Sequence, residues 1–234
     1  MYAELALHYD KLYAFKDYAG EAEKLKDIIH SHLGSERARL LDVACGTGRH
    51  LAFLRHWFDV EGLDLSAEML QVARAGSPGV VFHQADMVEF ALGQTFDVVT
   101  CLFGSIGYLK TMPRVRQALA CMASHLRPGG LLLVEPWFSP DSWNVGSVHG
   151  LFIDEPELKI ARINTSFAEG RVSYFDLHYL IGTPEGTQHL VERHELGLFS
   201  VQEMRAALGG LDLKLRYDVE GLCGRGLYVC TKTR

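Results

Sequence analysis

The stretch RLLDVACGTG, residues 39–48, decides the fold. After Arg39, its first half is an apolar run broken only by Asp42, which is typical of a short strand with both faces buried. Gly46 and Gly48 follow, and an apolar pattern of helical spacing begins at residue 50. Because glycine has no β-carbon, the backbone can approach a ligand closely at such a strand-to-helix turn. We therefore expect a ligand at the carboxyl end of this strand.

Strand and helix patterns alternate on both sides of this turn. An amphipathic helix is expected over residues 22–33, and another over 50–57 directly after the glycines. The remaining elements are expected as strands over 60–65, 80–84, 96–102 and 131–136, and as helices over 67–75, capped by Ser66, and 115–126. Because short links join these elements, they predict an α/β fold, a mostly parallel sheet with helices on both faces.

The alternation stops after Pro136. Residues 150–199 contain strand-like runs at 159–167, 171–181 and 189–199, separated by turn sequences and without a long helical period. A helix over 200–208 and two strands over 213–219 and 227–231 then close the chain. We therefore expect a core of residues 1–138 and 200–234, with an antiparallel β insertion of residues 139–199 on the substrate side.

The composition argues against several classes of protein. The formal net charge of the 234 residues is −6 and Lys and Arg form no cluster, which argues against a nucleic-acid partner. No apolar run reaches the length of a membrane span, and the start of the sequence has no signal-peptide pattern. The five cysteines form no CxxC pair, and no histidine pair has a metal-ligand pattern. We expect a cytoplasmic protein with a small-molecule partner, no membrane association and no metal.

Acidic residues stand at the ends of the next two expected strands. Asp64 can accept both hydroxyls of a ribose, and Asp86 can accept from an adenine amino group that Met87 covers. These positions predict a nucleoside-shaped site. A dinucleotide-binding motif has a third glycine where this chain has Leu51, so the pattern favours a nucleoside without a pyrophosphate.

Four segments in order resemble the motifs of class I S-adenosylmethionine methyltransferases: residues 42–51, LDLS at 63–66, ADM at 85–87 and LRPGG at 126–130. The resemblance implies a Rossmann-like core and S-adenosylmethionine as cofactor. In similar enzymes a segment before the first helix folds over the donor. The expected cofactor-binding residues are Asp42, Ala44, Gly46, Gly48, Asp64, Leu65, Asp86, Met87 and Cys101, with Tyr13 and Lys16 from that segment.

A closer resemblance covers nearly the whole chain. VEPW at 134–137, DLHY at 176–179 and GRGL at 224–227 are similar to segments of bacterial N,N-dimethyltransferases that act on nucleotide-linked 3-amino-deoxysugars in antibiotic biosynthesis. The resemblance implies N-methylation of such an amino sugar. Two positions depart from the family pattern: Tyr108 replaces a His that faces the sugar amine, and Gly104 stands where the family has Ser.

Several residues are candidates for the reaction itself. An amine acceptor must be neutral, and a nearby phenol or imidazole can hold its hydrogens and take the released proton. The catalytic candidates are Tyr108, His178 and Tyr2, the last being similar to a lid tyrosine of the family. The substrate-binding candidates are Arg225, whose guanidinium suits a diphosphate, Trp137 and Tyr179.

Alternatives remain open at the level of sequence. The acceptor could be a hydroxyl or carboxylate of another small metabolite, which Tyr108 in place of the family's His favours. The chain could also be a methyltransferase-like binding protein without catalysis, although the intact donor motifs argue against it. A nicotinamide dehydrogenase fits least, because of Leu51. The outer face of the antiparallel insertion could form the interface of a homodimer.

Overall fold

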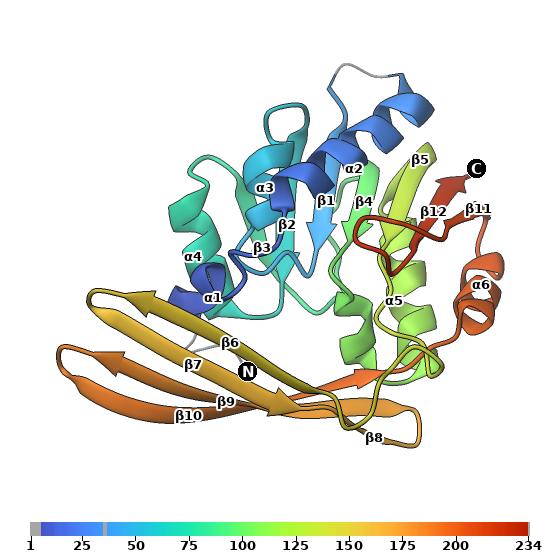
Figure 1. The fold of residues 1–234 in the computed structure, drawn as a ribbon. Helices are drawn as coiled ribbons and strands as arrows, with labels where there is room; N and C mark the ends of the chain where they lie inside the picture. The colour runs from blue at the N-terminus through green and yellow to red at the C-terminus, as the bar shows by residue number, and fades with distance from the viewer. Residues whose placement is uncertain (1–5, 35–36, 234) are drawn as a thin grey trace.

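Two sheets of different kinds organise the computed structural model, which describes residues 6–34 and 37–233 (Figure 1). The larger sheet has seven strands in the order β11-β12-β5-β4-β1-β2-β3, and the smaller has the order β10-β9-β7-β6 with β8 paired to β9. The larger sheet consists of β1 (Arg39–Val43), β2 (Asp59–Asp64), β3 (Val81–Gln84), β4 (Phe96–Cys101), β5 (Leu126–Val134), β11 (Leu213–Asp218) and β12 (Leu227–Lys232).

Strand β1 lies at the point where the order of the larger sheet reverses. Its neighbours β2 and β4 are both parallel to it, and β3 and β5 continue the parallel sheet on either side. Strand β12 is antiparallel to both β5 and β11. In a sheet of this kind a crevice opens at the carboxyl end of the strand where the order reverses. The predicted α/β fold is confirmed, and its expected ligand site falls at this crevice.

Helices cover both faces of the larger sheet, as predicted. Residues of α2 (Tyr18–Leu33), α3 (Arg49–Leu54) and α4 (Ala67–Gly76) share one buried apolar cluster with the sheet. Residues of α5 (Met112–Ser124) and α6 (Val201–Gly209) share the cluster on the other face. The chain also forms α1 (Ala6–Leu12) and the short 3₁₀ helix η1 (Ser105–Leu109), and these two elements border the cavity described below.

Element boundaries differ from the prediction where caps override periodicity. Helix α2 begins at Tyr18 because the Asp17 side chain accepts from the backbone N–H of Gly20 at 2.9 Å, which caps the helix. Ser66 caps α4 as predicted, by accepting from the N–H of Met69. Leu126, expected at the end of a helix, instead opens β5 and pairs with Phe96. Neither α1 nor β6 was anticipated.

The smaller sheet is the antiparallel insertion that the sequence predicted. It consists of β6 (Val148–Glu155), β7 (Leu158–Thr165), β8 (Phe167–Glu169), β9 (Val172–Thr183) and β10 (Gly186–Gly197). Alternate residues face opposite sides of such a sheet. One face buries Leu158, Ile160, Leu177, Tyr179 and Ile181 together with Leu12 of α1. The division of the chain into a core of residues 1–138 and 200–234 and an insertion of residues 139–199 stays a prediction.

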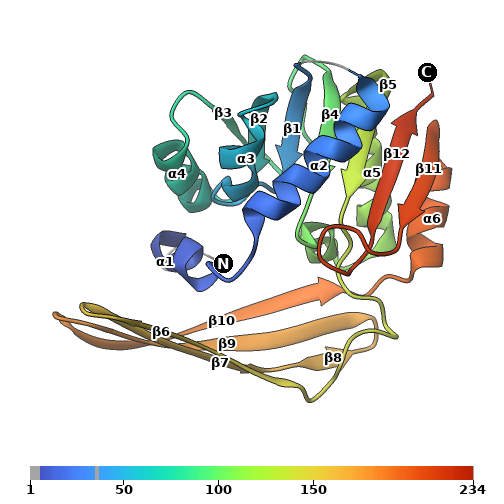
Figure 2. The same cartoon turned by 45° about the horizontal axis from the view of Figure 1, so that its top comes forward.

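The smaller sheet lies across the carboxyl ends of the parallel strands, with α1 between the two sheets (Figure 2). Strand β10 is the strand nearest the core, and its residues contact η1. This arrangement encloses the crevice at β1 from the other side. No helix among the described residues has the length and apolar character needed to cross a bilayer.

Candidate active site

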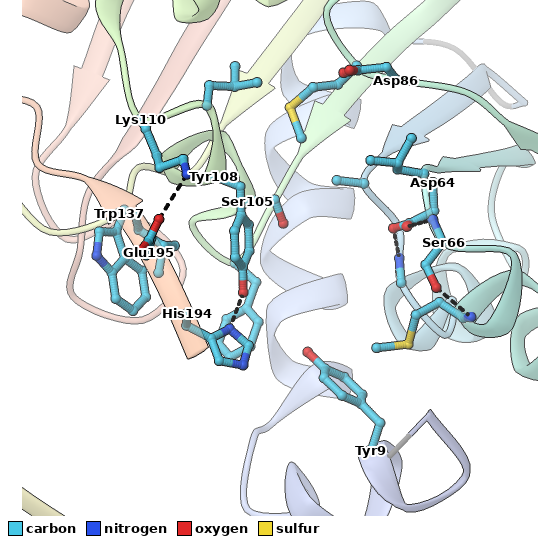
Figure 3. A pocket seen from close by; sticks show the side chains of 18 of the residues that line it. Tyr9, Asp64, Ser66, Asp86, Ser105, Tyr108, Lys110, Trp137, His194 and Glu195 are labelled. Carbon is cyan, nitrogen blue, oxygen red and sulfur yellow. Dashed lines mark hydrogen bonds and ion pairs between the residues drawn. The ribbon is translucent and has the colours of Figure 1, made fainter. Parts of the chain in front are cut away.

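A cavity of about 860 Å³ lies between the carboxyl ends of the parallel strands and the smaller sheet. We call the side formed by Ala44, Gly46, Asp64 and Asp86 the donor wall, and the side formed by Tyr108, Trp137 and His194 the acceptor wall. Figure 3 shows the two walls facing each other, with Tyr9 of α1 directed into the space between them. The volume suits a ligand of drug size or larger.

The backbone of the donor wall is held in a left-handed conformation. Gly46 has φ of 56° and Ala44 has φ of 58°, which is uncommon for a residue with a β-carbon and typical of functional sites. A β-carbon built on Gly46 meets no atom within 4 Å, because it points into open space. Gly48 also has a positive φ but lies against Ala73 and Phe82, and it does not line the cavity. Its role is therefore close packing of the turn.

Asp64 fixes this turn and remains able to accept from a ligand. Its Oδ2 accepts from the N–H of Gly46 at 2.8 Å, and its Oδ1 accepts from the N–H of Ser66 at 2.9 Å. Burial raises the pKa of the carboxyl group, and the backbone N–H groups oppose that shift. Each carboxylate oxygen has a second lone pair, so the geometry fits the two hydroxyls of a ribose.

Asp86 and its neighbours form the far end of the donor wall. The Oδ1 atom of Asp86 accepts from the N–H of Val88 at 3.1 Å, and Arg114 lies 3.3 Å from Oδ2. Met87 and Leu65 also line the cavity, and Leu65 is 65% exposed. An exposed leucine and a methionine beside two carboxylates provide an apolar surface for a flat ring with polar groups at its edge.

Asp42 lies beside a second, smaller cavity of about 50 Å³, which Gly46, Arg49 and Tyr9 also line. Its carboxyl group is 2% exposed and accepts from the Thr100 hydroxyl at 2.7 Å. Burial raises its pKa to about 6, while the Thr100 hydrogen bond and the nearby His50 limit the shift. A buried carboxylate of this kind is stabilised by a neighbouring positive charge, such as a sulfonium.

The N-terminal candidates divide into two groups. Tyr13 lines the cavity, and its ring meets the edge of Phe103 at a centroid distance of 5.6 Å. Lys16 does not line the cavity, because its ammonium forms a buried salt bridge with Glu21. Burial raises the pKa of Glu21, but hydrogen bonds with His50 and Lys16 outweigh it and lower the pKa overall. The cofactor role predicted for Lys16 therefore does not fit, and Tyr2 lies outside the described residues.

Arg225 serves the framework of the site. Its guanidinium donates to Glu135 at 2.9 Å, and Glu135 is fully buried. The same carboxylate accepts from the N–H of Phe103 at 2.6 Å and from the thiol of Cys223 at 2.9 Å. The guanidinium thus neutralises this buried carboxylate, and Arg225 also lines the cavity, so its role in binding a diphosphate stays a prediction. Through Glu135, Arg225 also fixes the backbone of Phe103, which has φ of 55° and lies just after β4.

Tyr108 meets a histidine on the acceptor wall that the sequence did not indicate. The Tyr108 hydroxyl and the Nδ1 atom of His194 are 2.8 Å apart, joining η1 to β10 across the cavity edge (Figure 3). His194 is 2% exposed, and its ring stacks on Phe175 at 5.3 Å. His194 faces the cavity, and His189, five residues earlier in the same strand, faces outward.

His178 lies on the wrong face of the smaller sheet for catalysis. It is exposed and stacks on His189 at a centroid distance of 5.5 Å, and it does not line the cavity. In β9 the odd-numbered residues Phe175 and Tyr179 face the core, so the even-numbered His178 faces away. Its predicted catalytic role therefore does not fit the structure.

Two other candidates are buried behind the cavity surface. Tyr179 is 2% exposed and packs in the cluster under the smaller sheet, and Cys101 is 0% exposed and packs within the larger sheet. Burial raises the pKa of both the Tyr179 phenol and the Cys101 thiol. Neither lines the cavity, so Phe103 and Ser105 take the place predicted for Cys101.

Trp137 lines the cavity, as predicted, and explains one departure from the family pattern. Its Nε1 donates to the Ser173 hydroxyl at 3.0 Å, which ties the segment after β5 to β9 of the smaller sheet. A β-carbon at Gly104 would lie 2.8 Å from the Trp137 ring, and Gly104 has φ of 73°. Serine at this position would therefore clash unless the tryptophan moved.

Comparison with known proteins identifies the family. Residues 40–130 match the model of a methyltransferase domain. The chain is 39% identical over 216 residues to dTDP-3-amino-3,4,6-trideoxy-alpha-D-glucopyranose N,N-dimethyltransferase from Streptomyces venezuelae, covering 92% of this chain and 91% of that protein. It is 37% identical over 224 residues to dTDP-4-amino-2,3,4,6-tetradeoxy-D-glucose N,N-dimethyltransferase from Saccharopolyspora spinosa, covering 94% and 90%.

A solved structure agrees with both relatives. An amino pentose methyltransferase from Micromonospora echinaspora, involved in calicheamicin biosynthesis and determined with bound S-adenosylmethionine, has 40% sequence identity and a TM-score of 0.85 over 93% of this chain and 92% of that chain. At this coverage the likeness extends over both sheets. The chain is an S-adenosylmethionine-dependent methyltransferase and belongs to the family of nucleotide-linked amino sugar N,N-dimethyltransferases.

Proposed function

We propose that this methyltransferase methylates the amine of a nucleotide-linked amino sugar. The observation that carries the proposal is a single cavity with two different walls. The donor wall offers carboxylates and an apolar surface to a nucleoside, and the acceptor wall offers a phenol hydrogen-bonded to a buried imidazole. The two dimethyltransferases to which the chain is similar act on dTDP-linked amino sugars with the amine at different ring positions.

S-adenosylmethionine, when bound, supplies the methyl group. The residues of the chain then have three tasks: Asp64 and Asp86 orient the nucleoside, Trp137 and Phe175 exclude water, and Tyr108 holds the amine. Methyl transfer is an in-line displacement, so orientation of the neutral amine supplies most of the acceleration. Tyr108 takes over the position of the family's His, because its hydroxyl both donates and accepts a hydrogen bond.

Cationic side chains at the mouth of the cavity support an anionic, nucleotide-linked substrate. Lys110, Arg114 and Arg193 all line the cavity. Lys110 lies 2.9 Å from Glu195, and Arg193 lies 2.8 Å from Asp176. These pairs are partly exposed, so their cations can rearrange toward a phosphate at small cost. They are further candidates for binding the diphosphate, beside Arg225.

The test is mass spectrometry of dTDP-linked 3-amino and 4-amino sugars incubated with the protein and S-adenosylmethionine. One or two added methyl groups on nitrogen are expected, together with loss of the product when the amine is acetylated beforehand. Methylation of the matching sugar that carries a hydroxyl in place of the amine would support O-methylation, the second candidate. No product with any acceptor, alongside donor binding by calorimetry, would contradict the proposal.

We also infer that the chain forms a homodimer through the outer face of the smaller sheet. Apolar residues gather there, each at least 48% exposed. Ile163 and Val191 both pair with His178, and Leu180 lies two residues further along β9, so the patch is continuous. A symmetric dimer buries the same patch on both copies. The patch consists of Val148, Phe152, Ile163, Leu180 and Val191.

Sedimentation of two matched variants tests this interface. Leu180 and Val81 are each 53% exposed, but Val81 lies at the edge of the larger sheet. Leu180→Lys is expected to shift the protein to monomer, and Val81→Lys is expected to leave its mass unchanged. A wild-type protein that sediments as a monomer at micromolar concentration would contradict the dimer.

We place the enzyme in the cytoplasm, which agrees with the unpaired state of Cys45, Cys101, Cys121, Cys223 and Cys230.

A further inference from the structure

We propose that Tyr108, His194 and Glu192 form a proton relay that accepts the proton released by the methylated amine. The inference rests on the proposed function, and it concerns two residues of β10 with no role in the reaction so far. Glu192 and His194 are two residues apart in the strand and therefore point to the same face. That face is the one turned toward the cavity, where His194 meets Tyr108.

The distances put the three groups in series. The Tyr108 hydroxyl lies 2.8 Å from Nδ1 of His194, and Nε2 on the other side of the ring lies 3.6 Å from Oε2 of Glu192. The side chains of His194 and Glu192 are 3% and 13% exposed. When Nδ1 accepts from the phenol, the proton of the neutral ring resides on Nε2 and faces the carboxylate. In so buried a setting the ion pair that forms on protonation is poorly screened.

The imidazole is also held rigidly, as a relay requires. Its ring lies parallel to Phe175 with an angle of 5° between the two planes. Strand β10 is tied to β9 along its whole length by regular antiparallel pairing. A fixed ring keeps both nitrogens aligned with their partners, so no rearrangement is needed at the moment of proton transfer.

Other charged and titratable groups surround the relay. Arg162 of β7 and Glu192 lie close enough to Tyr13 and Tyr179 to alter their pKa values, although burial is the largest cause of the upward shift of both phenols. Tyr9 of α1 approaches from the opposite side, and its pKa is raised first by burial and then by Tyr13, Tyr18, Tyr108 and Asp10. Arg162 lowers the pKa of the same two phenols whose pKa Glu192 raises.

The step balances without a further reactant. The amine nitrogen forms a bond to the methyl carbon as the bond from sulfur to that carbon breaks, and the sulfur keeps the electron pair. The resulting ammonium gives one proton to the Tyr108 oxygen while the phenol proton moves to Nδ1 of His194. The imidazolium is then stabilised by Glu192. After the product leaves, the ring returns the proton through Tyr108 to water.

The experiment compares kcat and donor affinity in His194→Asn, Tyr108→Phe, their double variant and Glu192→Gln, and it follows the ionisation of His194 in Glu192→Gln. His194→Asn keeps an oxygen that can accept from Tyr108 but cannot take up a proton, and kcat is expected to fall about 100-fold. Tyr108→Phe is expected to cause a similar loss, and the double variant little more, because the two residues act as one unit. Donor binding measured by calorimetry is expected to stay within about twofold in all of them.

Glu192→Gln separates a relay from a purely structural pair. Its kcat is expected to fall about tenfold, and the ¹⁵N resonances of the His194 ring are expected to titrate at a lower pH than in the wild-type protein. Removal of the carboxylate makes protonation of the imidazole less favourable. The matched control is His83→Asn, because His83 also pairs with a carboxylate, Glu61, at 2.8 Å but lies away from the cavity. Its kcat is expected to be unchanged.

The outcomes distinguish the relay from the proposed function. Full kcat in His194→Asn, or an unchanged ring titration in Glu192→Gln, beside an active wild-type protein would contradict the relay alone. An inactive wild-type protein with every amino sugar would contradict the proposed function. Should His194→Asn fail to fold, Glu192→Gln carries the test, since it keeps the shape of the side chain and removes only its charge.

Discussion

The donor wall comes from the carboxyl ends of consecutive elements between β1 and β3, whereas the acceptor wall joins residues 86 positions apart, in η1 and β10. The donor wall is shaped mainly by backbone: positive φ at Ala44 and Gly46, and N–H groups fixed by Asp64. The acceptor wall depends on side chains from η1, from the segment after β5 and from β10. Because the donor wall is formed by local backbone, substitutions elsewhere in the chain leave its shape intact. Because the acceptor wall is formed by side chains from distant segments, a few substitutions there can change which substrate the enzyme accepts.

Loss of the ion pair between Arg225 and Glu135, which supports both walls, is expected to have the largest effect. Arg225→Met leaves Glu135 fully buried without its cation, and the free energy of unfolding is expected to fall by about 3–5 kcal/mol. Urea unfolding measures this change. The control is Arg37→Met, because the salt bridge of Arg37 with Asp59 is well exposed and its loss costs about 0–1 kcal/mol.

A double variant sharpens this prediction. Adding Glu135→Gln to Arg225→Met removes the unpaired charge and is expected to restore part of the stability. If Arg225→Met were as stable as the wild-type protein but bound the substrate poorly, Arg225 would after all be a substrate-binding residue. The framework assignment would then be wrong.

The buried charge of Asp42, which lies next to the donor wall, is expected to have the next largest effect. The pKa of Asp42 is about 6 in the folded protein against an ordinary value of 3.8, so ionised Asp42 opposes folding. This cost is absent below the ordinary pKa and fully present above about pH 6. Asp42→Asn is therefore expected to stabilise the protein by about 3 kcal/mol at pH 8 and to have little effect at pH 4.

Donor binding gives the complementary measurement. A sulfonium near Asp42 favours the carboxylate, so binding of S-adenosylmethionine near pH 6 is expected to release a proton, and the Asn variant is expected to release fewer. Calorimetry in buffers of different ionisation enthalpy detects this difference. An equal proton release by both proteins would show that Asp42 does not sense the donor.

A matched pair of glycines tests the backbone of the donor wall. Gly46 and Gly170 both have φ of 56°, and a β-carbon at either meets no atom within 4 Å. Each substitution to Ala is expected to cost about 1–2 kcal/mol of stability. Only Gly46→Ala is expected to weaken donor binding, by about 30-fold, because its β-carbon points to where the ligand approaches. Equal donor affinity in the two variants would contradict the assigned donor wall.

A substitution that disturbs the acceptor wall is expected to have the smallest effect. A β-carbon on Gly107 would lie 2.8 Å from the Trp137 side chain and 3.2 Å from Leu196, so Gly107→Ala pushes η1 away from β10. The kcat is expected to fall about tenfold, while donor affinity stays constant, because the donor wall is untouched. A weaker donor affinity with unchanged kcat would reverse the assignment of the two walls.

The sequence predicted the donor wall well because its signals are local. Asp64, Asp86 and Met87 could be assigned because they follow strands whose carboxyl ends must meet at one edge of a parallel sheet. Gly48 was placed at the correct turn, but its spacing could not show that it packs against Ala73 instead of the ligand.

The acceptor wall was predicted less well because its residues meet only through tertiary contacts. Tyr108 was selected by resemblance, but its partner His194 had no motif of its own; the alternation of β10 was the one available signal. His178 was chosen for its motif, although the period of two places it on the face opposite to Phe175. Which face of β9 turns toward the core depends on how the smaller sheet packs against the neighbouring sheet. No local sequence pattern encodes that packing.

The sequence alone therefore determined the alternation of elements, the antiparallel insertion, the donor turn and the family. Local periodicity and the geometry of glycine and strand ends are properties of short segments, which explains this success. The tertiary structure decided the pairing of Arg225 with Glu135, the burial of Tyr179 and Cys101, and the contact of Tyr108 with His194. Those outcomes depend on how two sheets pack across a cavity, so they arise only when distant segments are brought together.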